Sequence, residues 1–308
     1  MSFLSDNTSP VCPEIMQALL DVNEGMAQAY VADDISAQLD DVFSTLCERR
    51  VRVFPVVTGT AANSVAASVL SPPYGTIFVH EEAHMEVDEC GAPEFFTGGA
   101  KLTLVQGQHG KICPKAFEGS LDRFYRSVHM VEPKALSLTQ STELGTVYSV
   151  SEIEALTTIA KSRGLKVHMD GARFANALAH LNVKPADITW RAGIDVLSFG
   201  ATKNGAMAAE AIVFFDEEDV SDTEWRRKRV GHLISKMRYV SAQLLAYVTD
   251  DLWLRNAQHS NRLATIIDGS AKGRCLHPVQ ANEVFLTLTD AEKETLRAQG
   301  FYCLLYTS

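Results

Sequence analysis

Three charged side chains, Asp170, Arg173 and Lys203, stand where two apolar stretches end, and both stretches are expected to be buried strands. The first stretch, Val167-His-Met-Asp170, turns through Gly-Ala to Arg173, and the second, beginning at Asp195, leads through Gly-Ala-Thr to Lys203. Ligands of open α/β sheets bind at the carboxyl ends of strands, so we expect the three side chains to meet there. A lysine that can form an imine, with a carboxylate or arginine for the pyridine nitrogen, suits pyridoxal phosphate.

Two of these residues also have an ordinary structural interpretation. Lys203 alone could be a surface lysine in a loop, and Asp170 before Gly171 could be a turn residue. We favour the cofactor interpretation because both follow apolar strands and would lie beside Arg173. A lysine at the end of such a strand is partly desolvated, which favours the reactive neutral amine.

A metal site is the weaker alternative. His168 and Asp170 are two positions apart on an expected strand, so both side chains point to one face and could share a metal. Two ligands without a third are weak support. The six cysteines include no Cys-x-x-Cys pair, which excludes the common zinc frameworks and indicates reduced thiols in a cytoplasm. We therefore expect no metal.

The segment Thr58-Gly-Thr60 lies between an expected strand and an apolar helix. Backbone N–H groups at such a helix start can bind a phosphate. Turns of this kind are also rich in Gly and Thr simply because these residues cap helices. The chain has no G-x-G-x-x-G and no Walker A lysine, which disfavours a dinucleotide or a nucleoside triphosphate.

Two histidines are candidates for proton transfer. His84 lies just past an expected strand and could stack on an aromatic ring or move protons near neutral pH, and His129 is the second candidate. A lone histidine is more often a hydrogen-bonded structural residue. We place in that class the remaining ones, namely His80, His109, His180, His232, His259 and His277.

The composition is that of an ordinary globular protein. Of the 308 residues, 46% are hydrophobic and 21% are charged. The net charge of -10 argues against a nucleic-acid partner, and the one dense basic run, 226–229, is typical of a solvated helix face. No apolar run is long enough to span a membrane, and the N-terminus does not resemble a secretory signal. We therefore expect a cytoplasmic protein.

Strands and helices are expected to alternate along the chain. The predicted strands cover residues 51–57, 76–79, 101–105, 135–138, 166–169, 196–199 and 211–215. The predicted helices cover 14–27, 34–49, an apolar segment that follows Asn63 and ends at Leu70, a segment opened by a capping box at Ser151–Glu154, and much of 225–252. Continuous apolar strands are typical of parallel sheets, so this order predicts a doubly wound α/β fold. We expect a large domain over 1–253 and a partial small α+β domain over 254–308.

Several motifs resemble those of low-specificity L-threonine aldolases, in the aldolase and β-eliminating lyase branch of the aspartate-aminotransferase-like fold. Asp170-Gly-Ala-Arg173 followed by Lys203 is the most specific of them. The resemblance extends to about Gln258 and more thinly beyond it. The other matching segments are Ser5-Asp-Asn7, Gly59-Thr-Ala-Ala-Asn63, Glu82-Ala-His84 with Glu89-Cys-Gly91, Gln140-Ser-Thr-Glu-Leu-Gly-Thr-Val-Tyr148 and Ser235-Lys-Met-Arg238.

This resemblance implies a role for each matching cofactor residue. Lys203 would hold pyridoxal phosphate as an aldimine, and Asp170 would contact the pyridinium nitrogen. Arg173 would lie beside the phenolic oxygen of the cofactor. The phosphate would bind to Gly59 and Thr60.

The resemblance also implies roles around the substrate. His84 would stack on the cofactor ring, and His129 would line the substrate side. Ser5 would help to bind the substrate carboxylate. Arg238 would lie near the cofactor phosphate or a neighbouring subunit, in a homodimer or homotetramer.

The implied activity is cleavage of L-threonine, L-allo-threonine or a related β-hydroxy-α-amino acid such as phenylserine into glycine and an aldehyde. The base that takes the β-hydroxyl proton could be His84, His129 or a water. One alternative is a pyridoxal-phosphate β-eliminating lyase, which would release pyruvate and ammonia. The other is a non-catalytic cofactor-binding remnant.

The chain departs from the family pattern in two places. Tyr30-Val-Ala-Asp33 stands where the family has Tyr-Gly-x-Asp. The family also continues into a segment with an arginine, in an Arg-Leu-Val-Thr context, that grips the substrate carboxylate. The segment Gln299–Ser308 contains no such arginine, so we expect a truncated or altered end.

Overall fold

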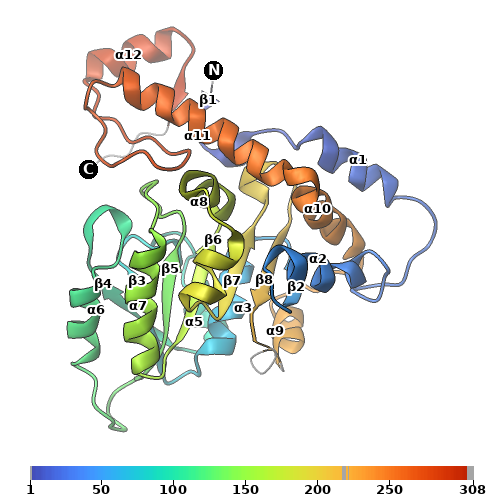
Figure 1. The fold of residues 1–308 in the computed structure, drawn as a ribbon, viewed down its shortest axis with the longest axis vertical. Helices are drawn as coiled ribbons and strands as arrows, with labels where there is room; N and C mark the ends of the chain where they lie inside the picture. Colours follow the sequence, from blue (N-terminus) through green and yellow to red (C-terminus); the bar gives the residue numbers. More distant parts are fainter. Residues whose placement is uncertain (1, 217–219, 221, 304–308) are drawn as a thin grey trace.

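The computed structural model describes residues 2–216, 220 and 222–303 of the chain. Its centre is a seven-stranded sheet (Figure 1). In spatial order the strands are β2 (Arg52–Val56), β8 (Glu210–Phe214), β7 (Val196–Gly200), β6 (Lys166–Gly171), β5 (Glu132–Thr139), β3 (Gly75–His80) and β4 (Lys101–Val105). All seven predicted strands are therefore present.

Five neighbouring strands, β7, β6, β5, β3 and β4, run parallel to one another. The expectation that β8 is a parallel strand is wrong, because β8 is antiparallel to both β7 and β2. Only a short turn joins β7 to β8, and a parallel pairing would need a longer crossover. The apolar run in β8 reflects burial on both faces and not strand direction, since all five of its residues are buried.

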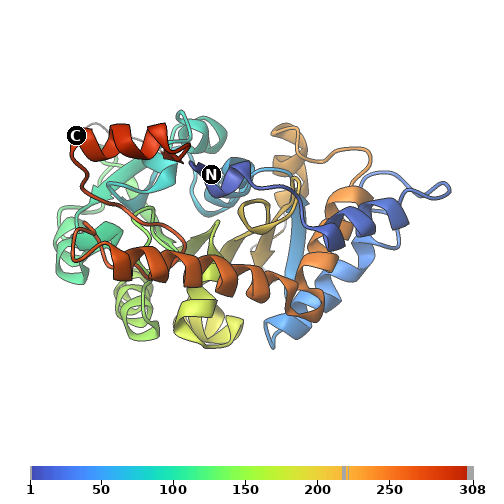
Figure 2. The ribbon, with the colours of Figure 1, turned by 90° about the horizontal axis from the view of Figure 1, so that it is seen from above.

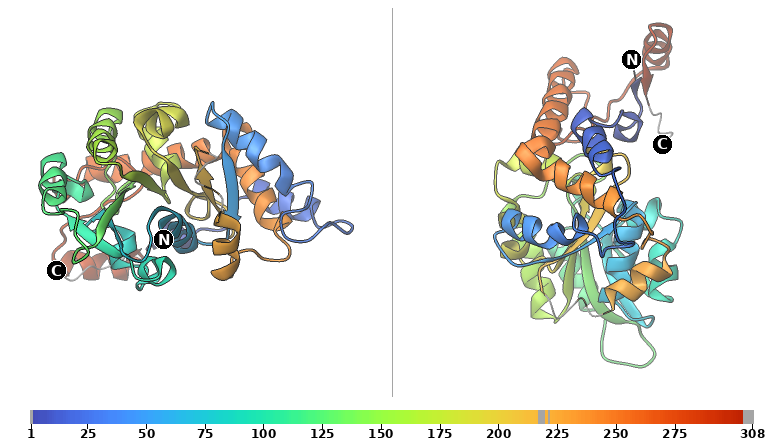
Figure 3. Two further views of the ribbon diagram at one scale, coloured as in Figure 1. Left: turned by 90° about the horizontal axis from the view of Figure 1, so that it is seen from below. Right: turned by 90° about the vertical axis from the view of Figure 1, so that its right-hand side faces the viewer.

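Helices cover both faces of the sheet, as Figure 3 shows. One face carries α2 (Leu39–Leu46), α6 (Pro114–Leu121), α7 (Val150–Ser162), α8 (Phe174–Leu181) and α10 (Arg238–Val248). The other face carries α3 (Gly59–Leu70), α5 (Ala92–Thr97) and α9 (Thr223–Arg229). The doubly wound α/β prediction is confirmed. The remaining helices are α1 (Pro13–Asp21), the short α4 (His84–Val87), α11 (Leu252–Ser270) and α12 (Asp290–Ala298).

Three predicted helix limits differ from the structure. The capping box that opens α7 is Ser149 with Glu152, because the Ser149 hydroxyl accepts from the Glu152 N–H and the Glu152 carboxylate accepts from the Ser149 N–H. Helix α1 ends at Asp21, where the chain turns toward Gly25 with a positive φ of 62°. The stretch 225–252 is interrupted at Gly231, whose φ is 79°.

The two ends of the described chain lie together. Strand β1 (Ser2–Phe3) pairs in parallel with β9 (Tyr302–Cys303), next to α12 (Figure 2). Helix α11 runs without interruption from the body of the protein, where it packs on α8, toward this region. The predicted boundary at residues 253 and 254 falls inside α11, and the division into two domains stays a prediction. In the described part of the chain no helix is long and apolar enough to cross a membrane.

Aromatic rings support the strand that leads to Lys203. The Phe199 ring, on β7, is edge-on to Phe43 at 5.0 Å and contacts Trp253 at 5.6 Å between centroids. Phe174 and Tyr247 complete the group. Such edge-on pairs add to the free energy gained by burying the rings.

We expect Phe199→Ala to lower the free energy of unfolding by about 3–5 kcal/mol, because it leaves a cavity among these rings. Urea unfolding followed by circular dichroism measures this loss. The matched control is Phe95→Ala, whose side chain is 75% exposed and which should change stability little. Equal losses in the two variants would contradict this account of the core.

Candidate active site

Asp170 is buried at the carboxyl end of β6, as the sequence predicted. Its Oδ2 accepts a hydrogen bond from Asn63 Nδ2 at 2.8 Å, and its Oδ1 accepts from the Ala172 N–H at 3.0 Å. Asn63 lies in the first turns of α3, on a neighbouring part of the same sheet edge. Both carboxylate oxygens are thus held by hydrogen-bond donors, which fix the orientation of the side chain.

A hydrogen-bonded chain leads from Asp170 to His84. The amide of Asn63 also donates to Glu89 Oε1 at 2.8 Å, and the same oxygen lies 2.8 Å from His84 Nδ1. The hydrogen bond to Glu89 raises the pKa of His84, although burial opposes it. Burial in turn raises the pKa of Glu89, against the influence of His84. His84 is therefore oriented by a buried acid, with its second ring nitrogen left for other partners.

Arg173 is buried between two carboxylates that come from opposite ends of the chain. Its Nε lies 2.7 Å from Asp6 Oδ2, and one of its terminal nitrogens lies 3.1 Å from Glu283 Oε1. Burial alone would raise the pKa of Asp6, but Arg173 outweighs it and leaves that pKa below its usual value. Burial raises the pKa of Glu283 to about 7. Asn282 also donates to Asp6, at 3.2 Å.

Lys203 lies in a short 3-10 helix, Thr202–Asn204, directly after β7. Asn204 fixes this turn by donating to the Tyr247 hydroxyl at 2.6 Å and to the Trp253 carbonyl at 2.8 Å. At Gly205 the chain turns with φ at 116°, and a Cβ there would lie 2.2 Å from Cys12 Sγ. The 3-10 helix Asp6–Thr8 packs against this turn, which brings Asp6 to the same edge as Lys203.

The predicted phosphate turn has the form that was expected. Gly59 and Thr60 are the first two residues of α3, and the Thr58 hydroxyl caps the helix by accepting from the Ala61 N–H at 3.2 Å. Amides at the first positions of a helix have no carbonyl partner within it. A Cβ on Gly59 would meet nothing within 4 Å, so the space above the turn is open for a ligand.

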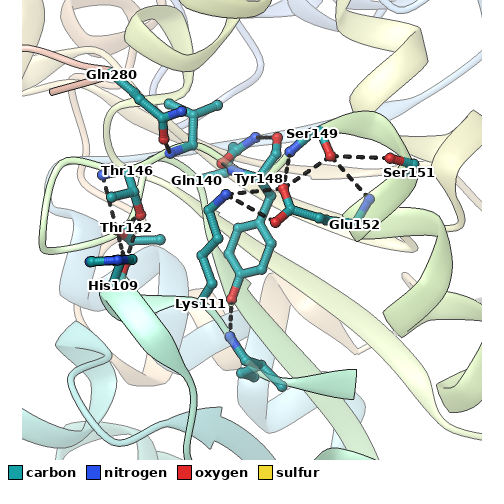
Figure 4. Close-up of polar contacts among 12 residues, drawn as sticks. His109, Lys111, Gln140, Thr142, Thr146, Tyr148, Ser149, Ser151, Glu152 and Gln280 are labelled. Atoms are coloured by element: carbon teal, nitrogen blue, oxygen red, sulfur yellow. Dashed lines mark hydrogen bonds and ion pairs between the residues drawn. The ribbon is translucent and has the colours of Figure 1, made fainter. Parts of the chain in front are cut away.

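Glu143 lies on the loop between β5 and α7. Polar contacts of other residues hold this loop in place (Figure 4). Gln140 exchanges two hydrogen bonds with the backbone of Tyr148, at 2.9 and 3.0 Å. The hydroxyls of Thr142 and Thr146 are 2.8 Å apart, and Thr146 also donates to the His109 carbonyl at 2.6 Å. Burial raises the pKa of Glu143, and Arg173, Asp170, Lys203 and His84 all act on its charge.

The structure does not bring every predicted residue to this group. Ser5 is adjacent to Asp6, and its hydroxyl accepts from the Asn7 N–H at 3.2 Å. The guanidinium of Arg238 reaches the Gly25 carbonyl at 3.5 Å and lies over the ring of Tyr239. Neither of these contacts is made with the phosphate turn.

His129 lies in an exposed segment before β5, at the amino end of the strand and so on the opposite edge of the sheet from Asp170. Within one chain it cannot meet the other candidates. His168 is buried below the site, and its two ring nitrogens contact the hydroxyls of Ser137 at 2.8 Å and Ser198 at 2.9 Å. Burial lowers its pKa to about 4, so it is a neutral structural residue.

Five side chains of the site were not assigned a role from the sequence. They are Asp6, Asn63, Glu89, Glu143 and Glu283. Four of them stand in the motifs that carry the family resemblance, and that position was the only signal of their place beside Asp170, Arg173 or His84. Glu283 lies outside those motifs, and nothing local in the sequence connects it to Arg173.

Several buried polar atoms of the site have no partner among the described residues. They are Asn63 Oδ1, Glu89 Oε2, Ser141 Oγ and Glu283 Oε2. Buried polar groups are rarely left unpaired, so these atoms indicate that a polar ligand belongs here. A lysine, a buried aspartate, an arginine and an open helix start at one edge fit a ligand with an aldehyde, a ring nitrogen and a phosphate.

Comparison with known proteins agrees with this geometry. A family profile described as "Beta-eliminating lyase" matches residues 2–291. The chain belongs to the beta-eliminating lyase family. The match covers both the sheet edge and the segment that contributes Glu283.

Related members of the family have specific names. The "Low specificity L-threonine aldolase" of Pseudomonas aeruginosa is 44% identical over 304 residues, covering 97% of this chain and 87% of that protein. The protein of the same name from Pseudomonas sp. is 42% identical over 304 residues, with the same coverage of 97% and 87%. The predicted resemblance to this group is confirmed.

Solved structures confirm the predicted fold. A threonine aldolase of Leishmania major superposes with a TM-score of 0.92 at 28% identity, covering 100% of this chain and 89% of that one. An aspartate aminotransferase from Thermotoga maritima superposes with a TM-score of 0.71 at 12% identity, covering 98% and 82%. The second likeness concerns the fold alone.

We expect Glu89→Gln to lower the pKa of His84, because a neutral amide no longer stabilises the imidazolium. Titration of the histidine Cε1–H signals by NMR measures the change, and loss of one signal in His84→Asn assigns it. His232 is the internal control, since its Nδ1 accepts from the Val57 N–H at 3.2 Å and no carboxylate is involved. An unchanged His84 titration would show that Glu89 does not control this ring.

Proposed function

We propose that this protein cleaves L-threonine, L-allo-threonine or related β-hydroxy-α-amino acids such as phenylserine into glycine and an aldehyde, with pyridoxal phosphate as cofactor. The observation that carries the proposal is the hydrogen-bonded series Asp170, Asn63, Glu89 and His84 at the sheet edge that also presents Lys203. Family membership and the two relatives above 40% identity support an aldolase. Preference among these substrates remains part of the proposal.

Family membership confirms the predicted cofactor. Lys203 would hold its aldehyde carbon, Asp170 its ring nitrogen, and Gly59 and Thr60 its phosphate. When bound, pyridoxal phosphate accepts the electrons of the Cα–Cβ bond as that bond breaks. The other side chains of the site orient the substrate and handle its protons.

Asp170 is suited to its role because both of its oxygens are held in place. Donors from Asn63 and Ala172 occupy them, and a carboxylate that faces the ring nitrogen would keep that nitrogen protonated. Asn63 also ties this carboxylate to the acid that orients His84. Asn63 thus supports two parts of the proposed reaction, the charge at the ring nitrogen and the proton transfer at the substrate.

His84 is the proposed base for the β-hydroxyl proton. Its Nδ1 contacts Glu89 at 2.8 Å, so Nε2 is the nitrogen that can receive the proton, while Glu89 stabilises the resulting imidazolium. We prefer His84 to His129 because His129 lies on the opposite edge of the sheet in the same chain. Stacking of His84 on the cofactor ring is compatible with this role and remains a prediction.

We propose that Arg173 lies beside the phenolic oxygen of the cofactor and that Ser5 helps to bind the substrate carboxylate. Arg173 is fixed by Asp6 at 2.7 Å, and Ser5 directly precedes that aspartate. Arg238 would contribute only near the phosphate or across a subunit contact, because its own contacts lie at Gly25 and Tyr239.

A β-eliminating lyase is the second candidate function, favoured by the description of the family itself. The same residues would serve it, with a leaving group on Cβ in place of the hydroxyl. Products separate the two reactions: glycine with an aldehyde for the aldolase, and pyruvate with ammonia for the eliminase. We propose the aldolase because the relatives at 42% and 44% identity carry that name.

Cytoplasmic location and a homodimer or homotetramer are further proposals. Cys12, Cys47, Cys90, Cys113 and Cys275 are free thiols, which suits a reducing compartment. Several large apolar side chains are well exposed in the single chain, including Trp225 at 70% and Met207 at 51%. Exposed apolar groups of this size are common at contacts between subunits.

Lys203→Ala should abolish both the visible absorbance of the cofactor-loaded protein and the mass gained on borohydride reduction, because the anchoring amine is gone. Intact-protein mass spectrometry and an absorbance spectrum measure the two. The control is Lys184→Ala, since Lys184 pairs with Glu48 at 2.6 Å on the surface. Undiminished borohydride labelling of Lys203→Ala would mean that another lysine is the anchor.

Asp170→Asn should reduce kcat/KM for threonine cleavage by roughly 100-fold or more, the scale of losing one preorganised charge, while the fold survives. Glycine and acetaldehyde release measures the rate, and circular dichroism checks folding. Asp122→Asn is the matched control, because Asp122 forms an exposed ion pair with Arg163 at 2.6 Å. Near-normal turnover in Asp170→Asn would show that Asp170 is only a turn residue.

A further inference from the structure

A loop that follows α11 reaches back to the active site. Its base is closed by a hydrogen bond of 2.9 Å from the Leu276 N–H to the Phe285 carbonyl. We call residues 277–284, between these two, the strap. Near its far end the strap carries Glu283 to Arg173, at 3.1 Å. The position of the strap therefore bears directly on the charges of the site.

The middle of the strap is bound to the loop that contains Glu143. The side chain of Gln280 accepts from the Val147 N–H at 2.8 Å (Figure 4). The N–H groups of Gln280 and Ala281 both donate to the Gly145 carbonyl, at 3.3 and 3.1 Å. The strap thus lies on the Glu143 loop and fixes its backbone from above.

A contact between two histidines attaches the start of the strap to the sheet edge. Nδ1 of His277 lies 3.1 Å from Nδ1 of His109, and the two rings are edge-on with centroids 5.4 Å apart. The His109 carbonyl accepts from the Thr146 hydroxyl at 2.6 Å, so His109 is itself held to the Glu143 loop. His109 is exposed and His277 is partly exposed, so protons from the solvent can reach both rings.

This contact depends on the protonation of the two rings. One Nδ1 must carry a hydrogen and the other must accept it, which requires that at least one ring is neutral. When both rings are protonated, each Nδ1 is a donor, and two positive rings would face each other across 3.1 Å. The contact is therefore lost when the second proton binds.

The surroundings of His277 set the direction of this change with pH. Burial and the charge of His109 lower the pKa of His277 from its ordinary value of 6.5, and Glu82, after β3, opposes them. Because the folded pKa is lowered, the contact contributes its full stability above about pH 6.5 and loses it as the pH falls through the lowered value. Glu283 is a second titrating group of the strap, since burial raises its pKa to about 7.

We propose that the contact between His109 and His277 is a pH-sensitive latch, which holds the strap on the active-site edge near neutral pH and releases it in acid. Release would loosen the backbone of the Glu143 loop and the pairing of Glu283 with Arg173. The latch is built from contacts within this chain and does not depend on which substrate the site takes.

The test compares hydrogen exchange of the strap in the wild-type chain and in His109→Asn, from about pH 7.5 to about pH 5, a range that spans the ordinary pKa of histidine. Mass spectrometry gives the exchange rate of peptides from the strap, and division by the intrinsic rate at each pH gives a protection factor. Asparagine suits position 109 because the backbone there is left-handed, with φ at 59°.

We expect protection of the strap to fall in acid more in the wild type than in His109→Asn. The difference should be roughly two- to ten-fold, the scale of losing one hydrogen bond. The titration of Glu283 is present in both chains, so the comparison isolates the histidine pair. NMR should also show a higher pKa of His277 in His109→Asn, because the like charge beside it is gone.

Two further variants complete the experiment. His259→Asn is the matched control, because His259 is an exposed histidine of α11 whose ring contacts Arg262 at 3.4 Å. It should keep the pH dependence of the wild type. His277→Asn removes the other ring of the latch and decides the question if His109→Asn does not fold.

Two results would overturn the latch. One is a wild-type strap whose protection does not fall in acid. The other is an equal fall in the wild type and in folded His109→Asn, or in His277→Asn when only that variant folds. Neither measurement involves turnover, so failure of the latch leaves the proposed function in place, and failure of the proposed function leaves the latch in place.

Discussion

The pairing of buried Arg173 with Asp6 and Glu283 is the constraint on which the rest of this structure depends. A guanidinium away from water needs charged partners, and here they come from both ends of the chain. Asp6 reaches the sheet edge from the N-terminal segment, and Glu283 reaches it from the segment after α11. The contact closes the chain over the carboxyl edge of the sheet, where β1 and β9 also pair nearby. Removing Arg173 would leave both buried carboxylates without the cation that pairs with them.

The site carries more acids than cations, and this imbalance defines what can bind. Asp6, Glu89, Glu143, Asp170 and Glu283 gather around Arg173 and Lys203. Burial and mutual repulsion raise the pKa of several of these carboxyls, Glu283 to about 7. Because the folded pKa of Glu283 lies above its unfolded value near 4.5, its ionisation costs stability as the pH rises between the two. A protonated ring nitrogen or a substrate ammonium would relieve this excess.

The central part of the site could be predicted from the sequence, for a local reason. Asp170 and Lys203 each follow an apolar strand, and strand ends of a parallel sheet share one edge, so their adjacency follows from the order of residues alone. The alternation of strands and helices indicated the fold in the same way. The direction of β8 could not be predicted from this pattern, since burial on both faces produces the same apolar run in parallel and antiparallel strands.

The supporting residues could not be predicted, because they meet across long stretches of chain. Asn63 and Asp170 are 107 residues apart in the sequence, and Asp6 and Arg173 are 167 residues apart. Neither contact is reflected in a periodic pattern of residues. The capping box of α7 was placed two residues late because Ser149 and Ser151 both precede a glutamate by three positions. His129 shows the opposite limit, since a role implied by a family resemblance specifies neither the edge of the sheet nor the chain on which the residue acts.

The groups around Lys203 come from distant parts of the sequence, and the structure holds them in different ways. In the proposed reaction His84 moves a proton, and it lies at the start of the short helix α4, where its ring is hydrogen-bonded to Glu89. Glu143 lies on the loop between β5 and α7, whose other residues are hydrogen-bonded to one another and to His109. Groups that must not move, such as Asp170, lie within strands. Lys203 is between these cases, in a turn fixed by Asn204 on one side and by Glu210 on the other. The proposed role of Lys203 is to bind the cofactor and release it to a substrate, and a backbone fixed in this way would suit that role.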